Sequence, residues 1–278
     1  MRPAQLPEAG VAAPRVRPGL LVGLAVVVAW AALIAVDDVL PGGGDGDIAD
    51  PTLAFLRTHV LSLSIVAVLL VAFVRWAGWS RDVWRERPER RVPRWWLAFP
   101  VLYTVQVAGG LTTVDWSQAS SYLLVLLVGT LLVGFTEELG VRGILLTGAR
   151  GTMPELGVLL VTCLVFGLLH GLNLLHGAPF GPTALQVAGT VGYGVLFYAI
   201  RRATGLLWPA MLLHGLNDFA RYAQPEVAGE TPDPPVWSVA ALVVAAVLAI
   251  GVVVFVVRES RRRPAATADG LERAGARP

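Results

Sequence analysis

The sequence has no lysine, a single cysteine and few charged residues of any kind. Its 22 basic residues are therefore all arginine. Charged side chains make up 15% of the 278 residues, whereas soluble domains carry about 25%. Together with 55% hydrophobic residues and a mean hydropathy of +0.64, this scarcity excludes an ordinary soluble domain. It predicts an all-α, polytopic membrane protein with one membrane domain.

The single cysteine and the absence of two sequence motifs limit the kinds of covalent link and catalytic site that the protein can contain. Cys163 cannot form an intramolecular disulfide, and because it lies in an apolar run we interpret it as a small buried hydrophobic residue. No His-Glu-x-x-His sequence supports a zincin-type site. No Gly-x-Ser-x-Gly sequence indicates a serine hydrolase. Any hydrolytic chemistry must therefore come from other residues.

Apolar runs close to the length of a membrane span recur along the chain. We place about eight transmembrane helices, at Gly19–Val36, Thr58–Val74, Trp95–Leu111, Ser121–Leu146, Glu155–Leu175, Thr183–Ile200, Leu206–Tyr222 and Val236–Val257. The transmembrane domain then covers residues 19–257. Residues 1–18 and 258–278 are expected to be disordered cytoplasmic tails.

Arginines are concentrated in alternate connections. They occur in both tails, in residues 75–94, at Arg150 and at Arg201-Arg202, while the other loops are acidic or nearly neutral. Because cytoplasmic loops of membrane proteins carry an excess of basic residues, this alternation predicts that both termini are cytoplasmic.

Residues 75–94 form the most basic connection, and tryptophans accompany the arginines there. Arginine with tryptophan at the end of a span is typical of the cytoplasmic membrane interface. The composition fits a short amphipathic helix that lies on an anionic leaflet. We expect the lipid bilayer as the partner and no nucleic acid, because the loop is short and lies between two spans.

Three charged residues, Glu137, Glu138 and Arg142, interrupt the fourth predicted span. One charge near the centre of a membrane helix costs roughly 2.5–3.5 kcal/mol on insertion scales, so a cluster of charges indicates a functional site that faces the protein interior. A structural ion pair that joins two helices is the alternative.

Helical spacing separates the roles of the two glutamates. Glu138 and Arg142 are four residues apart, so they lie on one helical face and can pair. Glu137 lies about 140° from Arg142 around the helix, so Arg142 neutralises it less. We therefore predict that Glu137 is a general base and that Glu138 supports it.

Two of the four histidines, His170 and His214, lie inside apolar runs at depths similar to that of Glu137. At 1.5 Å per residue, all three lie roughly 15–20 Å from the ends of their predicted helices. The same six residues, Leu-Leu-His-Gly-Leu-Asn, surround both histidines, which supports interpreting them together. The candidate supporting residues on the same helical faces are Phe166, Asn217 and Asp218.

Two histidines and a carboxylate support two kinds of chemistry. Glu137, His170 and His214 can bind a divalent metal such as zinc with an open position for water. Alternatively, the glutamate takes a proton from water while a histidine polarises a carbonyl or protonates the leaving group. Either chemistry suits hydrolysis of a peptide bond within the bilayer. The sequence does not require a metal, and the cofactor stays open.

These motifs together resemble a known family, the CAAX prenyl protease and bacteriocin-processing (CPBP) intramembrane proteases. The family pattern E-E-x-x-x-R, F-x-x-x-H and H-x-x-x-N/D is met, in order, by Glu137, Glu138 and Arg142, by Phe166 and His170, and by His214 and Asp218. The resemblance covers about residues 120–222. In the third motif Asp218 stands where asparagine is common and Asn217 lies one position early, so either can be the site residue.

The resemblance implies about eight helices and a water activated by Glu137, with His170 and His214 beside the water or the oxyanion. We therefore expect a multi-pass endopeptidase of a prokaryotic cell membrane that acts on membrane-associated or lipid-modified proteins or peptides. Two other functions compete. One is a non-catalytic immunity or binding protein in which the same residues join helices. The other is a proton-coupled transporter, against which the absence of an evident inverted repeat counts.

Overall fold

The structure is a computed structural model that describes residues 13–39, 48–87, 90, 92–225 and 232–262. Within these ranges the regular structure is helical and contains no strand. The one strand-like contact there is an isolated bridge between Arg85 and Leu206. The prediction of an all-α protein is therefore confirmed for this part of the chain.

Each expected span corresponds to a helical segment. The main helices are α1 (Leu20–Val39), α3 (Ser62–Ala77), α5 (Ala98–Leu111), α6 (Ser120–Glu138), α8 (Glu155–Leu169), α9 (Phe180–Thr204), α10 (Trp208–Tyr222) and α11 (Val236–Arg262). Shorter elements extend or join them: α2 (Pro51–Phe55), the π-helix η1 (Leu56–Leu61), α4 (Ser80–Trp84), the 3₁₀-helix η3 (Arg94–Leu97), the π-helix η4 (Leu139–Leu145), α7 (Leu146–Arg150) and the 3₁₀-helix η5 (His170–His176).

Five helical stretches among the described residues are long and apolar enough to cross a membrane. They are Pro51–Ala77, Ser120–Arg150, Glu155–Leu175, Phe180–Thr204 and Val236–Arg261. The chain is therefore a multi-pass integral membrane protein. The other three expected spans are shorter, since α1 is apolar over Leu20–Ile34 and α5 and α10 have 14 and 15 residues. A span perpendicular to the bilayer needs about 20 residues, so the count of eight stays a prediction.

The second span begins earlier than the sequence predicted. Its helix starts at Pro51 rather than at Thr58, because Asp50 caps it. Asp50 Oδ1 accepts hydrogen bonds from the backbone nitrogens of Thr52, at 2.8 Å, and Leu53, at 3.3 Å. Proline at the first helical position suits this start, since its missing N–H would have no helical partner there.

Both expected tails contribute to the ordered domain. The Val16 carbonyl oxygen accepts a hydrogen bond from Nε1 of Trp79 at 2.7 Å, so the described part of the N-terminal tail is bound to the bundle. At the other end, α11 continues past Val257 to Arg262, so residues 258–262 are helical rather than disordered. Residues 1–12 and 263–278 lie outside the described ranges.

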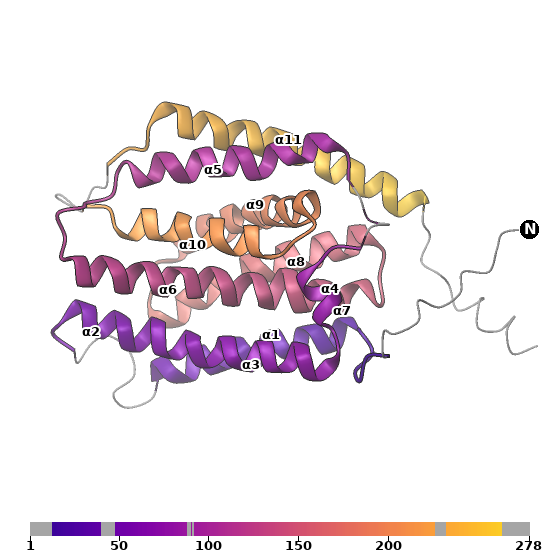
Figure 1. Cartoon of the computed structure of the whole chain (residues 1–278), viewed down its shortest axis with the longest axis horizontal. Helices are drawn as coiled ribbons and strands as arrows, with labels where there is room; N and C mark the ends of the chain where they lie inside the picture. The colour runs from indigo at the N-terminus through magenta and orange to yellow at the C-terminus, as the bar shows by residue number, and fades with distance from the viewer. Residues whose placement is uncertain (1–12, 40–47, 88–89, 91, 226–231, 263–278) are drawn as a thin grey trace, which may run out of the picture.

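The candidate site lies where α6 packs extensively along α10 in the middle of the bundle. Figure 1 shows α5 and α11 paired along one side of these two helices and α1 and α3 along the other. Helices α8 and α9 pack on each other and complete the bundle. Helix α7 continues α6, and it lies with α4 at the end of the bundle where α11 finishes (Figure 1).

Helix α4 is the short helix expected in the arginine-rich connection. It has five residues, and Val83 within it is completely buried. Trp79, which precedes α4, is 1% exposed. The helix is therefore anchored in the bundle through these side chains.

Candidate active site

Glu137 and Glu138 are the last two residues of α6, and the π-helical turn η4 follows them directly. Such turns inside α-helices occur frequently at functional sites. Arg142 Nη1 donates a hydrogen bond to Glu138 Oε1 at 3.0 Å, and both side chains are 0% exposed. The pair expected from the four-residue spacing is therefore formed.

Glu137 stands apart from this pair. Its side chain is 21% exposed and lies with Oε2 3.7 Å from Nε2 of His214. That separation is within ion-pair range but beyond hydrogen-bond distance. Oε2 makes no hydrogen bond to any described residue. Glu138 Oε2 likewise has no hydrogen bond to the described residues, but its side chain is 0% exposed, so of the two glutamates only Glu137 has a side chain that is partly exposed to a reacting molecule.

His214 on α10 connects the two glutamates. Its Nδ1 lies 3.2 Å from Glu138 Oε1, and its Nε2 faces both Glu137 and Asp218, with Oδ2 of Asp218 at 3.4 Å. Carboxylate oxygens on both sides of the ring fix its orientation. His214 is 6% exposed, so little water competes for these contacts.

Two phenylalanines hold the charged groups in place. The Arg142 guanidinium carbon lies 3.9 Å from the ring centroid of Phe166 and 5.5 Å from that of Phe197. The faces of aromatic rings attract cations, most strongly where water is excluded. Phe197 also stacks on His214, with ring centroids 4.7 Å apart and an interplanar angle of 19°.

His170 lies at the boundary between α8 and η5 and is partly exposed. Its Nδ1 is 3.0 Å from the backbone oxygen of Phe166. Because a carbonyl oxygen only accepts, Nδ1 donates, which leaves Nε2 as the free ring nitrogen. The Phe166 ring meets the His170 ring edge-on at 5.3 Å.

The structure distinguishes Asp218 from Asn217. Asp218 lies one helical turn after His214 and approaches it at 3.4 Å. No contact places Asn217 at His214. The residue that reaches the histidine is therefore the one at the H-x-x-x-N/D position.

Phe197 is the residue of this site that sequence reasoning missed. It lies on α9, in a span that carries none of the charged motifs, and is 1% exposed. An aromatic residue in an apolar run gives no signal by itself, so only the packing of α9 against α10 identifies it.

A three-ligand metal site is not formed by these residues. Among the residues that the structure describes, no three His, Cys, Asp or Glu side chains are grouped so that they could hold a metal ion. Glu137, His170 and His214, the possible ligands from the sequence, therefore do not fit such a site as they are arranged.

One comparison identifies the segment that builds this site. Residues 119–220 match a family model described as type II CAAX prenyl endopeptidase Rce1-like. This segment, a little over a third of the chain, is similar to the Rce1-like family. The matched segment contains every site residue from Glu137 to Asp218, and the family is a protease family. Comparisons with curated proteins and with solved structures give no match.

Proposed function

We propose that the protein is an intramembrane endopeptidase whose general base is Glu137. The observation that carries this proposal is the contrast between the two glutamates. Arg142 neutralises Glu138, which is fully buried and also contacts His214, whereas Glu137 lies beside His214 without an arginine partner among the described residues and with a side chain that is 21% exposed. The Rce1-like segment supports peptide-bond hydrolysis as the reaction. The substrates are membrane-associated or lipid-modified proteins or peptides.

The proposal includes eight membrane passes with both termini in the cytoplasm. Helix α1 begins and α11 finishes at the same end of the bundle (Figure 1), as an even number of passes requires. Arg150, Arg201 and Arg202 lie at that end, which supports a cytoplasmic location for it.

In this mechanism Glu137 removes a proton from a water molecule, and the water oxygen bonds to the carbonyl carbon of the peptide. The carbonyl electron pair moves onto its oxygen, and an Nε2–H group, either of His214 or of His170 in its doubly protonated form, stabilises the resulting oxyanion. When the C–N bond breaks, the proton held by Glu137 passes to the leaving amine. The site then returns to its starting protonation state.

The remaining residues position these groups. Glu138 fixes the His214 ring through Nδ1, and Arg142 balances the charge of Glu138. Phe166 and Phe197 confine Arg142. Because small misplacements of reacting groups cost large factors in rate, this support contributes to the reaction without touching the substrate.

The test compares cells that carry the wild-type chain, Glu137→Ala or Asp115→Ala at matched protein levels. Asp115→Ala is the control, since Asp115 is an exposed carboxylate bonded to Ser117 outside the site. N-terminal and C-terminal peptides are profiled in the membranes. New termini in the wild type and Asp115→Ala, but not in Glu137→Ala, are expected. A fully active Glu137→Ala variant would overturn the proposal.

A non-catalytic binding or immunity protein is the second candidate. Buried contacts among Glu138, Arg142 and His214 would equally serve to fasten α6 to α10. Identical peptide profiles, with Glu137→Ala folded and inserted in the membrane, would favour this candidate.

A further inference from the structure

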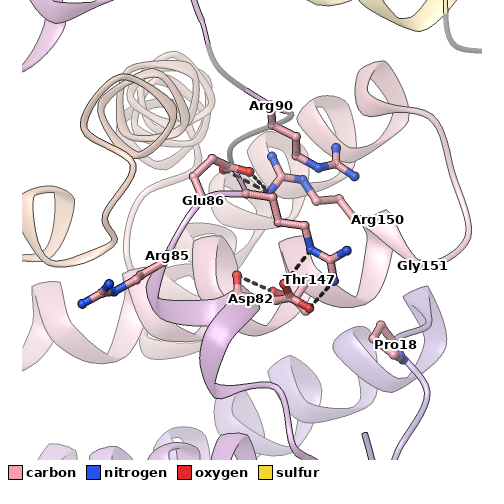
Figure 2. A pocket seen from close by; sticks show the side chains of 9 residues that line it. Pro18, Asp82, Arg85, Glu86, Arg90, Thr147, Arg150 and Gly151 are labelled. Carbon is pink, nitrogen blue, oxygen red and sulfur yellow. Dashed lines mark hydrogen bonds and ion pairs between the residues drawn. The ribbon is translucent and has the colours of Figure 1, made fainter. Parts of the chain in front are cut away.

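A charged cavity of about 130 Å³ lies at the arginine-rich end of the bundle. The charged side chains that line it are Asp82, Arg85, Glu86, Arg87, Arg90 and Arg150. Asp82 lies on α4, Arg150 ends α7, and the others lie in the connection after α4. Figure 2 shows that Arg85 points away from the other labelled charged side chains. The proposed reaction at Glu137 uses none of these residues.

The core of this cavity is a shared ion-pair network. Arg150 donates to Glu86 through Nη1 at 2.8 Å and to Glu155 through Nη2 at 2.6 Å. Arg90 donates to the same Glu155 carboxylate. The Glu155 side chain is 5% exposed and that of Glu86 is 4% exposed. Two nearly buried carboxylates thus hold Arg90 and Arg150 at the cavity wall.

Two buried arginines, Arg201 and Arg202, extend this network. Arg202 donates to Glu259 of α11 at 2.8 Å, and Arg201 donates to the backbone oxygen of Asp82 at 2.7 Å. Arg201 and Arg202 have side chains that are 1% and 0% exposed. Even so, Nε and Nη1 of Arg201 and Nε of Arg202 make no hydrogen bond to the described residues.

Among the residues that the structure describes, positive charge exceeds negative charge in this network. The arginines are Arg87, Arg90, Arg150, Arg201 and Arg202, and the carboxylates are Asp82, Glu86, Glu155 and Glu259. Five cations against four anions leave a surplus of one, and Arg85 at the rim adds a second. Burial and the neighbouring Arg150 lower the pKa of Arg90, which is the effect expected of crowded cations.

We propose that this cavity binds a phosphate group, supplied by the headgroup of an anionic lipid. Guanidinium groups present paired N–H donors that match phosphate oxygens, and one phosphodiester charge would balance the internal surplus. Basic pockets between membrane helices on the cytoplasmic side suit lipid headgroups in this way. The space is roughly ten times what one buried water needs.

The position of the cavity supports a lipid as the source. The described helix ends beside it are those of membrane-length stretches, at Arg150, Glu155 and Thr204. Trp76 and Trp95 are exposed at the ends of α3 and α5 on the same side of the bundle, as at a membrane interface. A headgroup at this level could reach the cavity while its acyl chains stay in the bilayer.

The test uses the full chain in a neutral detergent. Dioctanoyl phosphatidic acid, dioctanoyl phosphatidylcholine and inorganic phosphate are titrated separately, and bound adducts are counted by native mass spectrometry alongside the shift in Tm. The variants are Arg87→Gln, which removes a 61% exposed side chain, and Arg87→Gln/Arg90→Gln. Arg94→Gln is the matched control, since Arg94 is an exposed arginine that does not line the cavity.

Wild type and Arg94→Gln should bind one phosphatidic acid saturably. Affinity should fall about fivefold in Arg87→Gln and about 25-fold in the double variant, as expected for loss of one or two arginines near a membrane surface. Binding of inorganic phosphate with equal affinity would support the site but make free phosphate its ligand. Unsaturable binding, or an equal loss in Arg94→Gln, would overturn the proposal. If the double variant does not fold, Arg87→Gln alone decides.

Discussion

Gly134 of α6 lies against Gly215 of α10 with no room for a side chain at the contact. A Cβ added to Gly134 would lie 2.4 Å from the backbone oxygen of Met211 and 2.6 Å from the nitrogen of Gly215. His214 precedes Gly215, and Glu137 follows Gly134 by about one turn. The glycine contact therefore sets the distance between the proposed base and the histidine that faces it.

Gly134→Ala should push α6 away from α10, because backbone atoms rather than flexible side chains occupy the space. We expect cleavage to fall about 100-fold, as for a 1 Å misplacement of reacting groups. Gly192→Ala on α9 is the control, since no heavy atom lies within 4 Å of its added Cβ. It should keep activity and gain up to about 1 kcal/mol of stability from helix propensity. Equal activity in the two variants would contradict the prediction.

Glu138→Leu should destabilise the fold by about 3–5 kcal/mol, because it leaves the Arg142 charge buried without its partner. Glu138→Leu/Arg142→Leu should recover most of that stability, since no uncompensated charge remains. Cleavage should stay lost in both variants, because neither fixes the His214 ring through Nδ1. Denaturation midpoints in detergent and cleavage assays measure the two effects. A double variant no more stable than the single one would argue against the pair.

Phe197→Leu should reduce cleavage more than it reduces stability. It removes the ring that stacks on His214, and such aromatic contacts contribute about 0.5–1.5 kcal/mol beyond burial. Phe99→Leu is the matched control, since Phe99 is fully buried but packs on Trp95 and Trp96 away from the site. Both variants should lose similar stability, and only Phe197→Leu should lower kcat. A parallel loss of activity in Phe99→Leu would show a general effect of core damage.

The sequence predicted the parts of the site that depend on local periodicity. The Glu138–Arg142 pair follows from helical spacing and persists although η4 is π-helical, because residues four apart still share a face. The helical segments follow from runs of apolar residues in the same way. Both features depend only on residues that are close to one another in the sequence.

Features that depend on distant packing escaped prediction. The role of Phe197 requires α9 to lie beside α10, and the order at Val16 requires contact with Trp79, 63 residues away. The start of the second span at Pro51 depends on a cap by Asp50, which a count of apolar residues does not detect. The sequence likewise placed Glu155 only at the start of a span. Its partners are Arg90 in the connection after α4, Arg150 of α7, and Tyr198 and Arg202 of α9.

Tyr103 and Tyr198 are both buried tyrosines, but their hydroxyl groups differ in hydrogen bonding. The Tyr103 hydroxyl makes no hydrogen bond to the described residues, although the side chain is 1% exposed. The Tyr198 hydroxyl donates to Glu155 at 2.8 Å and accepts from Arg202 at 3.0 Å. Removing the two hydroxyl groups should therefore change stability in opposite directions.

Tyr103→Phe should raise stability by about 1 kcal/mol, because it removes a polar group that is buried without a partner. Tyr198→Phe should lower stability by about 1–3 kcal/mol, because it breaks bonds to two charged groups. Thermal unfolding of both variants in the same detergent measures the difference. If Tyr103→Phe is instead less stable than the wild type, its hydroxyl has a partner in the folded protein. If it keeps its stability but loses cleavage, that hydroxyl acts in the reaction.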